Sequence, residues 1–535
     1  MSLKKHNNIE ACQLILKELA HFGLSEIVYC AGSRNAPFIR CLGELENTRI
    51  YSFFEERSAA FFALGRCRAL QKPVAVVTTS GTAAAELLPA CIEAYYSGAP
   101  LVFITADRPS RLRFTGAPQC IDQSKFMSSF VEQSFDLENR AFTLAAWSQR
   151  APLHINLCID EPIIDAELGK WTLPQATKFR PTKLNKADNQ EVQQKMSAAG
   201  SKCERPLIIL GSLDGEKEIE AARKICLALQ WPTYAEGGSG LRESPTLKQF
   251  LIHGGEQFTC QLFKKFNFDL VLRLGSIPTT RLWRDLELAG EKTKVLSVSP
   301  LAFSGLSDSI FLHSDLASFC ESVNWTNTPK QMIWQKQIAL LDKEQSEFNE
   351  SLLQKYPRSE PALVRKISEL VEADELFYIG NSLPIREWDL AATYERPKQI
   401  FANRGANGID GQLSSYLGMT ATSAGRSWCL LGDLTALYDL AAPWALKSVS
   451  NKNQKIVILN NGGGQIFHRI YNDPLFENSH DLDFSHWAKM WRLDYQLWKG
   501  KTFEVLQPNT QVLEVVPDAE ETQNFWNELS EFVKK

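Results

Sequence analysis

Short apolar segments alternate with helical stretches along the whole chain, and this alternation constrains the fold more than any other feature. The first third contains four predicted strands, at residues 27–30, 74–78, 101–105 and 153–157. A helix is predicted over residues 10–22, and an Ala-rich helix over 82–96 joins the second strand to the third. A strand, a helix and a further strand in this order make a right-handed crossover with parallel strands. The pattern therefore predicts α/β architecture.

The alternation recurs twice more along the 535 residues, a length too great for one core at roughly 150 residues per domain. The second region has predicted strands at 207–210, 270–274 and 295–298, with a helix over 216–229. The third has predicted strands at 376–379, 400–402, 428–431, 456–459 and 512–516. We therefore predict three doubly wound parallel-sheet domains, at 1–180, 195–335 and 350–535. A polar, lysine-rich linker is expected over 170–206, and a mostly helical stretch over 327–356.

Composition excludes several classes of protein. The chain has 58 Lys+Arg against 62 Asp+Glu, so a strongly basic nucleic-acid-binding protein is not expected. Its 12 cysteines form no CxxC pair and its 8 histidines no HExxH, which removes the common zinc motifs. No segment approaches the roughly 18 apolar residues that span a bilayer, and the first 30 residues lack a signal-peptide core. We expect a cytoplasmic protein without membrane insertion, with reduced and mostly buried thiols.

Two loops of the third region contain the residue pattern that points most specifically to a chemistry. Gly432-Asp433-Leu434 follows one predicted strand, a helix is predicted over residues 437–449, and Asn460-Asn461 with three glycines follows the next strand. The carboxyl ends of adjacent parallel strands meet at one sheet edge, so Asp433 and Asn461 are expected to face one point. Carboxylate, amide and loop carbonyl oxygens suit Mg²⁺, or Mn²⁺, with phosphate oxygens completing the shell. Each loop alone is a common turn, but together they resemble the metal and diphosphate motif of thiamine-diphosphate (ThDP) enzymes, except that many members have Gly in place of Leu434.

ThDP chemistry also requires a carboxyl group. In that superfamily, a glutamate from the pyrimidine-binding domain bonds ring nitrogen N1′ and favours the imino tautomer that removes the thiazolium C2 proton. Glu55 and Glu56 both follow the apolar stretch 50–54 and open a predicted helix. The family pattern selects Glu56, directly before Arg57. The alternative is that both glutamates simply favour a helix N-terminus.

The whole chain resembles one family closely, 2-succinyl-5-enolpyruvyl-6-hydroxy-3-cyclohexene-1-carboxylate (SEPHCHC) synthase, the MenD family of ThDP-dependent enzymes. The motifs that carry the resemblance are AGSRNAP at 31–37, TSGTA at 79–83, TADRP at 105–109, GAPQ at 116–119, GNSLPIR at 380–386, NRGANGIDG at 403–411 and GDLTALYDL at 432–440. The run NRGAxGIDG is far more specific than the two metal loops alone.

The resemblance implies pyrimidine-binding (PYR), central Rossmann-like and diphosphate-binding (PP) domains, in that order. It implies a transferase of menaquinone biosynthesis. 2-Oxoglutarate is decarboxylated with ThDP, and the succinyl-semialdehyde carbanion adds to isochorismate to give SEPHCHC. Both substrates are dicarboxylates, which guanidinium groups bind in bidentate fashion. A homodimer or homotetramer with active sites between chains is also implied.

The same resemblance assigns residues. Substrate contacts are expected from Ser33, Arg34, Arg108, Gln119, Arg281, Ser382 and Arg386. Cofactor contacts are expected from Glu56, Ile409, Gly432, Asp433, Leu434, Asn461, Gly463, Gln465 and Ile466, with Asp433, Asn461 and Gly463 also binding the metal. Arg404 is expected beside the reacting centre as a catalytic residue together with Glu56, the alternative for Arg404 being a structural interdomain salt bridge. Arg281 stands where the family often has Lys, which leaves its role open.

Some alternatives stay open at this point. Ile409 or Ile466 could be the apolar wedge that supports the bent form of ThDP, or either could be core. His468 is expected to face solvent, or to lie behind the metal ligands, rather than to act in catalysis. The tryptophans at 487, 491 and 498 are expected to pack at the edge of the third domain. Another ThDP-dependent 2-oxoacid decarboxylase or carboligase would use the same Glu56 and metal loops. A nucleotide-binding or interaction protein could also keep the fold without catalysis.

Overall fold

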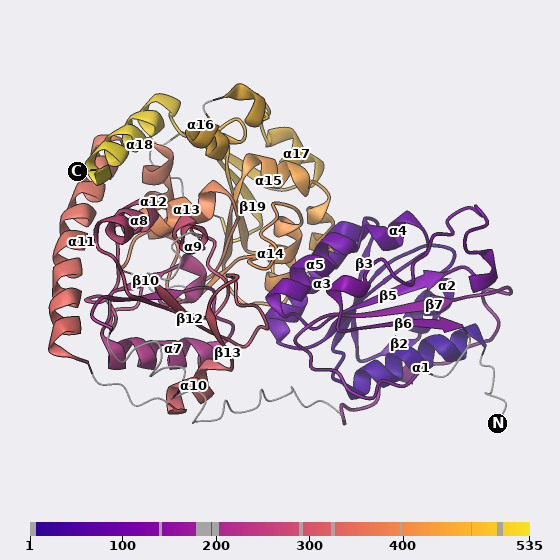
Figure 1. Cartoon of the computed structure of the whole chain (residues 1–535). Coiled ribbons are helices and arrows are strands. Elements are labelled where there is room, and N and C mark those ends of the chain that lie inside the picture. Colours follow the sequence, from indigo (N-terminus) through magenta and orange to yellow (C-terminus); the bar gives the residue numbers. More distant parts are fainter. Residues whose placement is uncertain are drawn as a thin grey trace. The chain divides into compact units, whose positions relative to one another are not determined.

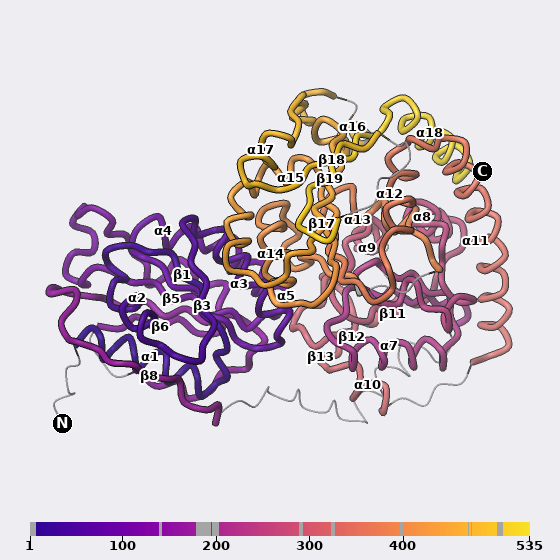
Figure 2. The backbone as a smooth tube through the Cα atoms, turned by 180° about the vertical axis from the view of Figure 1, so that it is seen from behind, coloured from indigo at the N-terminus to yellow at the C-terminus, as the bar shows by residue number. Residues whose placement is uncertain are grey.

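The computed structural model describes residues 7–138, 142–177, 194, 203–287, 293–322, 327–395, 399–471, 473–499 and 507–534. Its chain divides into two compact units. Unit 1 contains residues 1–182, 405–425 and 435–452, and unit 2 contains 183–404, 426–434 and 453–535. The chain therefore passes between the units several times, and each unit is described by itself (Figures 1 and 2).

Unit 1 is built on a parallel six-stranded sheet in the order β3-β1-β4-β5-β7-β6. Its strands are β1 (Glu26–Cys30), β3 (Arg49–Phe53), β4 (Val74–Thr78), β5 (Leu101–Asp107), β6 (Gln133–Glu138) and β7 (Leu153–Cys158). Strands β4, β5 and β7 are buried at every position, as expected for parallel strands covered on both faces. Helices α1 (Asn8–His21) and α2 (Ala36–Gly43) pack on one face, and α3 (Glu56–Leu70) and α5 (Leu88–Ser97) lie on the other (Figure 1).

A second layer of unit 1 comes from a distant part of the chain. Helix α14 (Gln412–Thr420) packs directly against α3. A Cβ at Gly65 would lie 2.1 Å from the Ser415 carbonyl oxygen, and one at Gly418 would lie 2.1 Å from the Phe62 carbonyl oxygen. Glycine at both positions therefore allows the two helix backbones to touch.

Unit 2 contains two further parallel sheets. The central one has the order β10-β9-β11-β12-β13. Its strands are β9 (Pro206–Leu210), β10 (Thr233–Ala235), β11 (Leu270–Leu274), β12 (Lys294–Ser299) and β13 (Ile310–His313). Helices α7 (Glu216–Leu229) and α10 (Leu316–Ser322) pack on one face, while α8 (Gly255–Lys265), α9 (Arg281–Leu286) and the long α11 (Pro329–Lys355) pack on the other (Figure 1).

The third sheet has the order β15-β14-β16-β17-β19-β18. Its strands are β14 (Leu376–Ile379), β15 (Gln399–Phe401), β16 (Ser427–Gly432), β17 (Gln454–Leu459), β18 (Asp494–Trp498) and β19 (Gln511–Val515). Helices α12 (Glu360–Leu370) and α13 (Leu383–Ala391) share a core with it. The three parallel sheets with interleaved helices confirm the predicted α/β class. The domain boundaries drawn from the sequence stay predictions.

Several local predictions were wrong in detail. Residues 82–96 form two helices, α4 (Thr82–Ala85) and α5, because the chain turns at 86–87 and Pro89 starts the second helix. The helix expected over 437–449 is instead α15 (Asp433–Tyr438) followed by a 3₁₀ turn, η5 (Ala442–Lys447), with Pro443 in its first turn. Of the expected linker, residues 171–172 form the short strand β8, paired with β2 (Leu45–Glu46). Most of the rest of that linker, 178–193 and 195–202, lies outside the described residues.

Other features match the expectations from composition. Most of the cysteines are buried, as predicted. Trp487 and Trp498 are also buried, and Trp498 ends the edge strand β18. Among the helices that the structure describes, none combines the length and apolar character needed to cross a membrane.

Candidate active site

Two adjacent strand ends of the third sheet carry the proposed metal ligands. Strands β16 and β17 are neighbours in register, with Gly432 opposite Leu459. Asp433 and Asn461 therefore leave the same edge of the sheet from neighbouring positions. This is the juxtaposition that the strand–helix–strand crossover predicted from sequence.

The Asp433 carboxylate organises the glycine loop. Its Oδ2 accepts hydrogen bonds from the backbone N–H groups of Gly462 at 2.9 Å and Gly463 at 3.0 Å, and its Oδ1 accepts one from Leu434 at 2.6 Å. Burial raises the pKa of Asp433, and the Leu434 and Gly463 N–H groups oppose that rise. Gly463 has φ +139°, and a Cβ there would lie 2.7 Å from the Glu477 carbonyl oxygen. The loop therefore needs glycine in order to close around the carboxylate.

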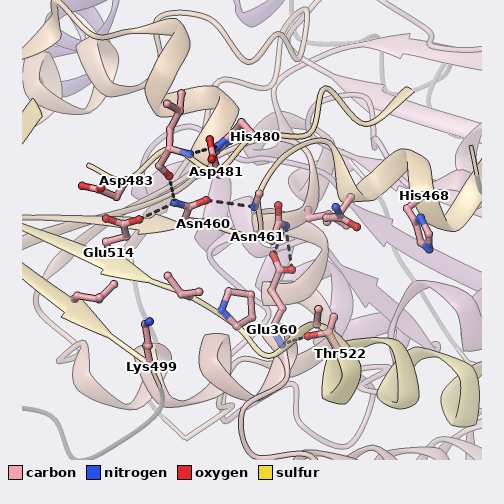
Figure 3. A pocket seen from close by; sticks show the side chains of 18 of the residues that line it. Glu360, Asn460, Asn461, His468, His480, Asp481, Asp483, Lys499, Glu514 and Thr522 are labelled. Carbon is pink, nitrogen blue, oxygen red and sulfur yellow. Dashed lines mark hydrogen bonds between the residues drawn. The ribbon is translucent and has the colours of Figure 1, made fainter. Parts of the chain in front are cut away.

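Asn461 is held with its amide oxygen unused (Figure 3). Its Nδ2 donates to both carboxylate oxygens of Glu360, at 3.1 and 3.0 Å. Its Oδ1 is buried and has no hydrogen-bond partner among the described residues. A buried unpaired oxygen of this kind is costly unless a ligand satisfies it. The orientation fits a metal ligand, and Glu360 at the start of α12 is a residue that the sequence motifs did not single out.

The donor set suits a hard cation. The described residues contain no cluster of three His, Cys, Asp or Glu side chains that could hold a metal. A cation here would rest on one carboxylate, one amide oxygen and a loop carbonyl, and phosphate oxygens and water would complete its shell. Mg²⁺ commonly binds in this way, so the residues present fit the group that the sequence predicted.

Two histidines lie near this loop. His480 Nε2 is 3.5 Å from Asp433 Oδ2 and, within the described structure, is buried with no hydrogen-bond partner. No motif had pointed to it. His468 lies instead in α16 (Gln465–Tyr471), where its Nδ1 contacts Glu477 Oε1 at 2.7 Å. With its side chain 38% exposed, His468 is closer to the solvent-facing alternative than to the position behind the ligands.

A pocket of about 700 Å³ opens beside the loop that follows β17. Asn461, Gly462, Gln465 and His480 line it, and Lys499 brings a cationic group (Figure 3). The Glu514 carboxylate at its wall accepts three hydrogen bonds, from Asn460 Nδ2, the Phe484 N–H and the Tyr495 hydroxyl. The predicted cofactor residue Gln465 thus lies on a cavity of ligand size. Ile466 is partly buried in the same helix.

Some, but not all, of the predicted substrate and catalytic residues of unit 2 lie together. Ser382 precedes α13 with φ +73°, and Arg386, one turn into that helix, donates from Nη1 to the Ser382 carbonyl oxygen at 2.6 Å. Arg386 and the buried Arg404 line one small cavity. Arg281 is not part of that lining. Its side chain is 68% exposed and lies 3.6 Å from Asp285.

The predicted substrate residues of unit 1 lie after strands of its sheet. Ser33 and Arg34 follow β1, and Arg108 follows β5. Arg34 is buried and donates to the Ile159 carbonyl oxygen at 3.0 Å. The Nε of Arg108 is buried, with no partner in the part of the chain that the structure describes. Gln119 adopts φ +56°, and a Cβ at Gly81 would lie 3.2 Å from its Cα.

The structure distinguishes the surroundings of the two adjacent glutamates. Glu55 is the N-cap of α3, and its carboxylate accepts from the N–H groups of Arg57 at 3.1 Å and Ser58 at 2.9 Å. Glu55 therefore performs the capping role considered for both residues. Glu56 is partly buried, and burial raises the pKa of its carboxyl above the ordinary value. Ile409, the other candidate wedge, is also partly buried in unit 1.

Comparisons with known proteins identify the family of this chain. Residues 9–126 match the family model described as thiamine pyrophosphate enzyme, N-terminal TPP binding domain. A 2-succinyl-5-enolpyruvyl-6-hydroxy-3-cyclohexene-1-carboxylate synthase of Bdellovibrio bacteriovorus is 39% identical over 97% of this chain and 98% of its own length. Proteins of the same name from Akkermansia muciniphila and Geobacillus kaustophilus are 35% and 34% identical. They cover 94% and 88% of this chain, and the matches span 95% and 87% of their own lengths.

The similarity to the Bdellovibrio protein extends along nearly the whole chain. Identity above 30% over such a length is shared by members of one family. The chain belongs to the SEPHCHC synthase family of ThDP-dependent enzymes and is a transferase of menaquinone biosynthesis.

Proposed function

We propose that this protein decarboxylates 2-oxoglutarate and transfers the remaining succinyl unit to isochorismate, giving SEPHCHC. The observation that carries the proposal is the pair of loops around Asp433 and Asn461, in a chain whose full-length relatives bear the name of this synthase. ThDP, when bound, supplies the carbanion chemistry that decarboxylation of a 2-oxoacid requires.

The residues of the chain have separate tasks in this proposal. Asp433, Asn461 and the Gly463 carbonyl would hold Mg²⁺, or Mn²⁺ in its place, and so fix the diphosphate. Glu56 would donate or accept a proton at ring nitrogen N1′ of the pyrimidine. Its raised pKa favours retention of that proton at a higher pH than for an exposed glutamate.

The arginines would bind the two dicarboxylate substrates. Arg386 and Arg404 are brought to one cavity in unit 2, while Arg34 and Arg108 lie at the strand ends of unit 1. We assign Ser33, Gln119 and Ser382 as polar contacts of the same substrates, and Arg404 as the residue beside the reacting centre. The exposure of Arg281 supports at most a contact at the mouth of the site.

We also propose a cytoplasmic homodimer or homotetramer that completes each active site between two chains. Sedimentation measured across a dilution series tests this, together with activity at each concentration. A monomer with full activity per chain would exclude the shared site.

The decisive assay supplies the purified chain with ThDP, Mg²⁺, 2-oxoglutarate and isochorismate. We expect one mole of CO₂ to be released for each mole of isochorismate consumed, the latter followed by its loss of absorbance. If pyruvate is decarboxylated and isochorismate persists, the protein is a different ThDP-dependent decarboxylase or carboligase. If calorimetry detects no binding of ThDP with Mg²⁺, the catalytic proposal fails as a whole.

A further inference from the structure

A buried carboxylate of the central sheet contacts one of the proposed substrate arginines. Glu236 follows β10 directly and is 2% exposed. Its Oε1 accepts a hydrogen bond from the Thr279 N–H at 2.8 Å and lies 3.6 Å from Nη2 of Arg404. Its Oε2 is buried without a hydrogen-bond partner among the residues described. No motif in the sequence singles out Glu236.

Arg404 is held at two of its nitrogens. Its Nη1 donates to Asn381 Oδ1 at 3.0 Å, and its Nη2 faces Glu236. Asn381 is itself fixed, because its Nδ2 donates to the Asn403 carbonyl oxygen at 2.9 Å. A planar guanidinium held at both Nη atoms has a defined orientation. Since the Arg404 side chain is only 6% exposed, its charge also needs a nearby anion.

The residue after Glu236 connects to the helix that carries the second arginine. The Gly237 N–H donates to Asp389 Oδ1 at 2.7 Å, and Asp389 lies in α13 three positions after Arg386. A Cβ at Gly237 would lie 3.1 Å from that oxygen and 3.2 Å from Cδ1 of Trp388. Glycine therefore permits this approach. Two consecutive residues of one loop thus contact the structure around both Arg404 and Arg386.

A third contact of the same loop holds the end of α13. Arg242 is 2% exposed and donates from Nη2 to the carbonyl oxygens of Asp389 and Ala392, both at 3.1 Å. Its guanidinium carbon lies 3.9 Å from the ring centre of Tyr394. Cationic groups at a helix C-terminus stabilise its unpaired carbonyls. The loop after β10 is therefore attached by several contacts to the helix of Arg386.

We propose that Glu236 is a positioning residue that sets the orientation of the Arg404 guanidinium for the reaction. This inference rests on the proposed function of Arg404. The role differs from a salt bridge for stability alone, because the carboxylate directs a group that touches substrate. It also gives Glu236, a residue of the central domain, a part in catalysis although its own carboxylate touches no substrate.

The test is Glu236→Gln in the full-length holoenzyme. The amide oxygen can still accept from Thr279 N–H, so the variant removes the charge opposite Arg404 and little else. We expect kcat to fall roughly 10- to 100-fold, the loss expected for a misplaced catalytic group. KM for 2-oxoglutarate should not rise, because removing a negative charge does not weaken attraction for a dianion. Glu236→Asp keeps the charge and should recover part of kcat.

Asp342→Asn provides a matched control. Asp342 is also a buried carboxylate of unit 2, and it accepts from the His253 and Gly254 N–H groups. It makes no contact with Arg404. We expect this control to change the melting temperature but not kcat per folded molecule. If Glu236→Gln behaves in the same way, Glu236 is only structural and the inference is overturned.

A double-mutant cycle with Arg404→Gln separates the inference from the proposed function. If Glu236 acts through Arg404, its substitution should have little further effect on kcat in the Arg404→Gln background. An equal fold-loss in both backgrounds would refute the positioning role. Full activity of Arg404→Gln alone would instead refute the role assigned to Arg404. The wild-type assay with 2-oxoglutarate and isochorismate tests the proposed reaction separately.

Discussion

The ion pair between Glu26 and Arg66 offers a strong test of how unit 1 is held together. Arg66 lies in α3 with its side chain fully buried. Its Nε donates to Glu26 Oε2 at 2.6 Å and its Nη2 to Glu26 Oε1 at 2.9 Å, a bidentate pair. Its Nη1 donates to the Gly418 carbonyl oxygen of α14 at 3.1 Å. One guanidinium therefore links β1, α3 and α14.

The substitution Glu26→Gln leaves that guanidinium buried without its anion. Breaking a buried pair in this way costs about 3–5 kcal/mol in the free energy of unfolding. For a unit of this size, each kcal/mol corresponds to roughly 2–4 °C in melting temperature. We therefore expect the transition of unit 1 to fall by roughly 6–20 °C.

Arg49 supplies the matched control. It contacts the same carboxylate at 3.3 Å, but its side chain is 53% exposed. Solvent screens such a pair, so Arg49→Met should cost at most about 1 kcal/mol. Urea unfolding followed by far-UV circular dichroism gives both values, and hydrogen exchange in α3 and α14 locates the loss. A Glu26→Gln protein as stable as wild type, or an Arg49→Met protein equally weakened, would refute the reasoning.

Three further outcomes are expected. Glu56→Gln should lower turnover roughly 10²- to 10⁴-fold with an unchanged melting curve, and undiminished turnover would exclude Glu56 as the activating group. In Glu360→Ala the Asn461 amide loses its hydrogen-bonded support. The Mg²⁺ concentration needed for half-maximal binding of ThDP, measured by calorimetry, should therefore rise roughly 10- to 100-fold. An unchanged Mg²⁺ concentration would count against Asn461 as a metal ligand. Burial lowers the pKa of His154 from about 6.5 to about 4, so the unfolded chain binds a proton that the native chain does not. Stability should therefore fall as the pH decreases from 6.5 to 4, by up to about 3 kcal/mol from this group, and His154→Gln should flatten that slope in urea titrations.

The buried strands were predictable because their signal is local. Strands β4 and β11 have the predicted bounds, since each is a continuous apolar run between polar turns. Strands β6 and β18 went unrecognised, because they lie at sheet edges and carry polar, partly exposed residues. The break between α4 and α5 depends on packing as well as on Pro89, and an Ala-rich pattern does not mark it.

The adjacency of the two candidate metal loops was predictable for a topological reason. Consecutive parallel strands bring Asp433 and Asn461 together whatever the side chains around them. Glu360 and His480 had no such signal, because they reach the loop from segments whose placement depends on tertiary packing. Glu236 was hidden for the same reason, since its partner Arg404 is distant in sequence. The choice of Glu56 over Glu55 needed the motif, and the capping geometry of Glu55 supports it.

The packing of α14 on α3 limits how this protein can be divided or recombined. A fragment that ends at residue 182 would retain α3 but lose the helix that covers it, together with the carbonyl that binds Arg66. Such a fragment should aggregate or remain partly unfolded, even though it contains a complete parallel sheet. Exchanging the N-terminal portion between relatives would likewise require the exchange of residues 405–425 and 435–452. A chimera must therefore exchange all three segments together, and a single crossover point in the gene cannot achieve that exchange.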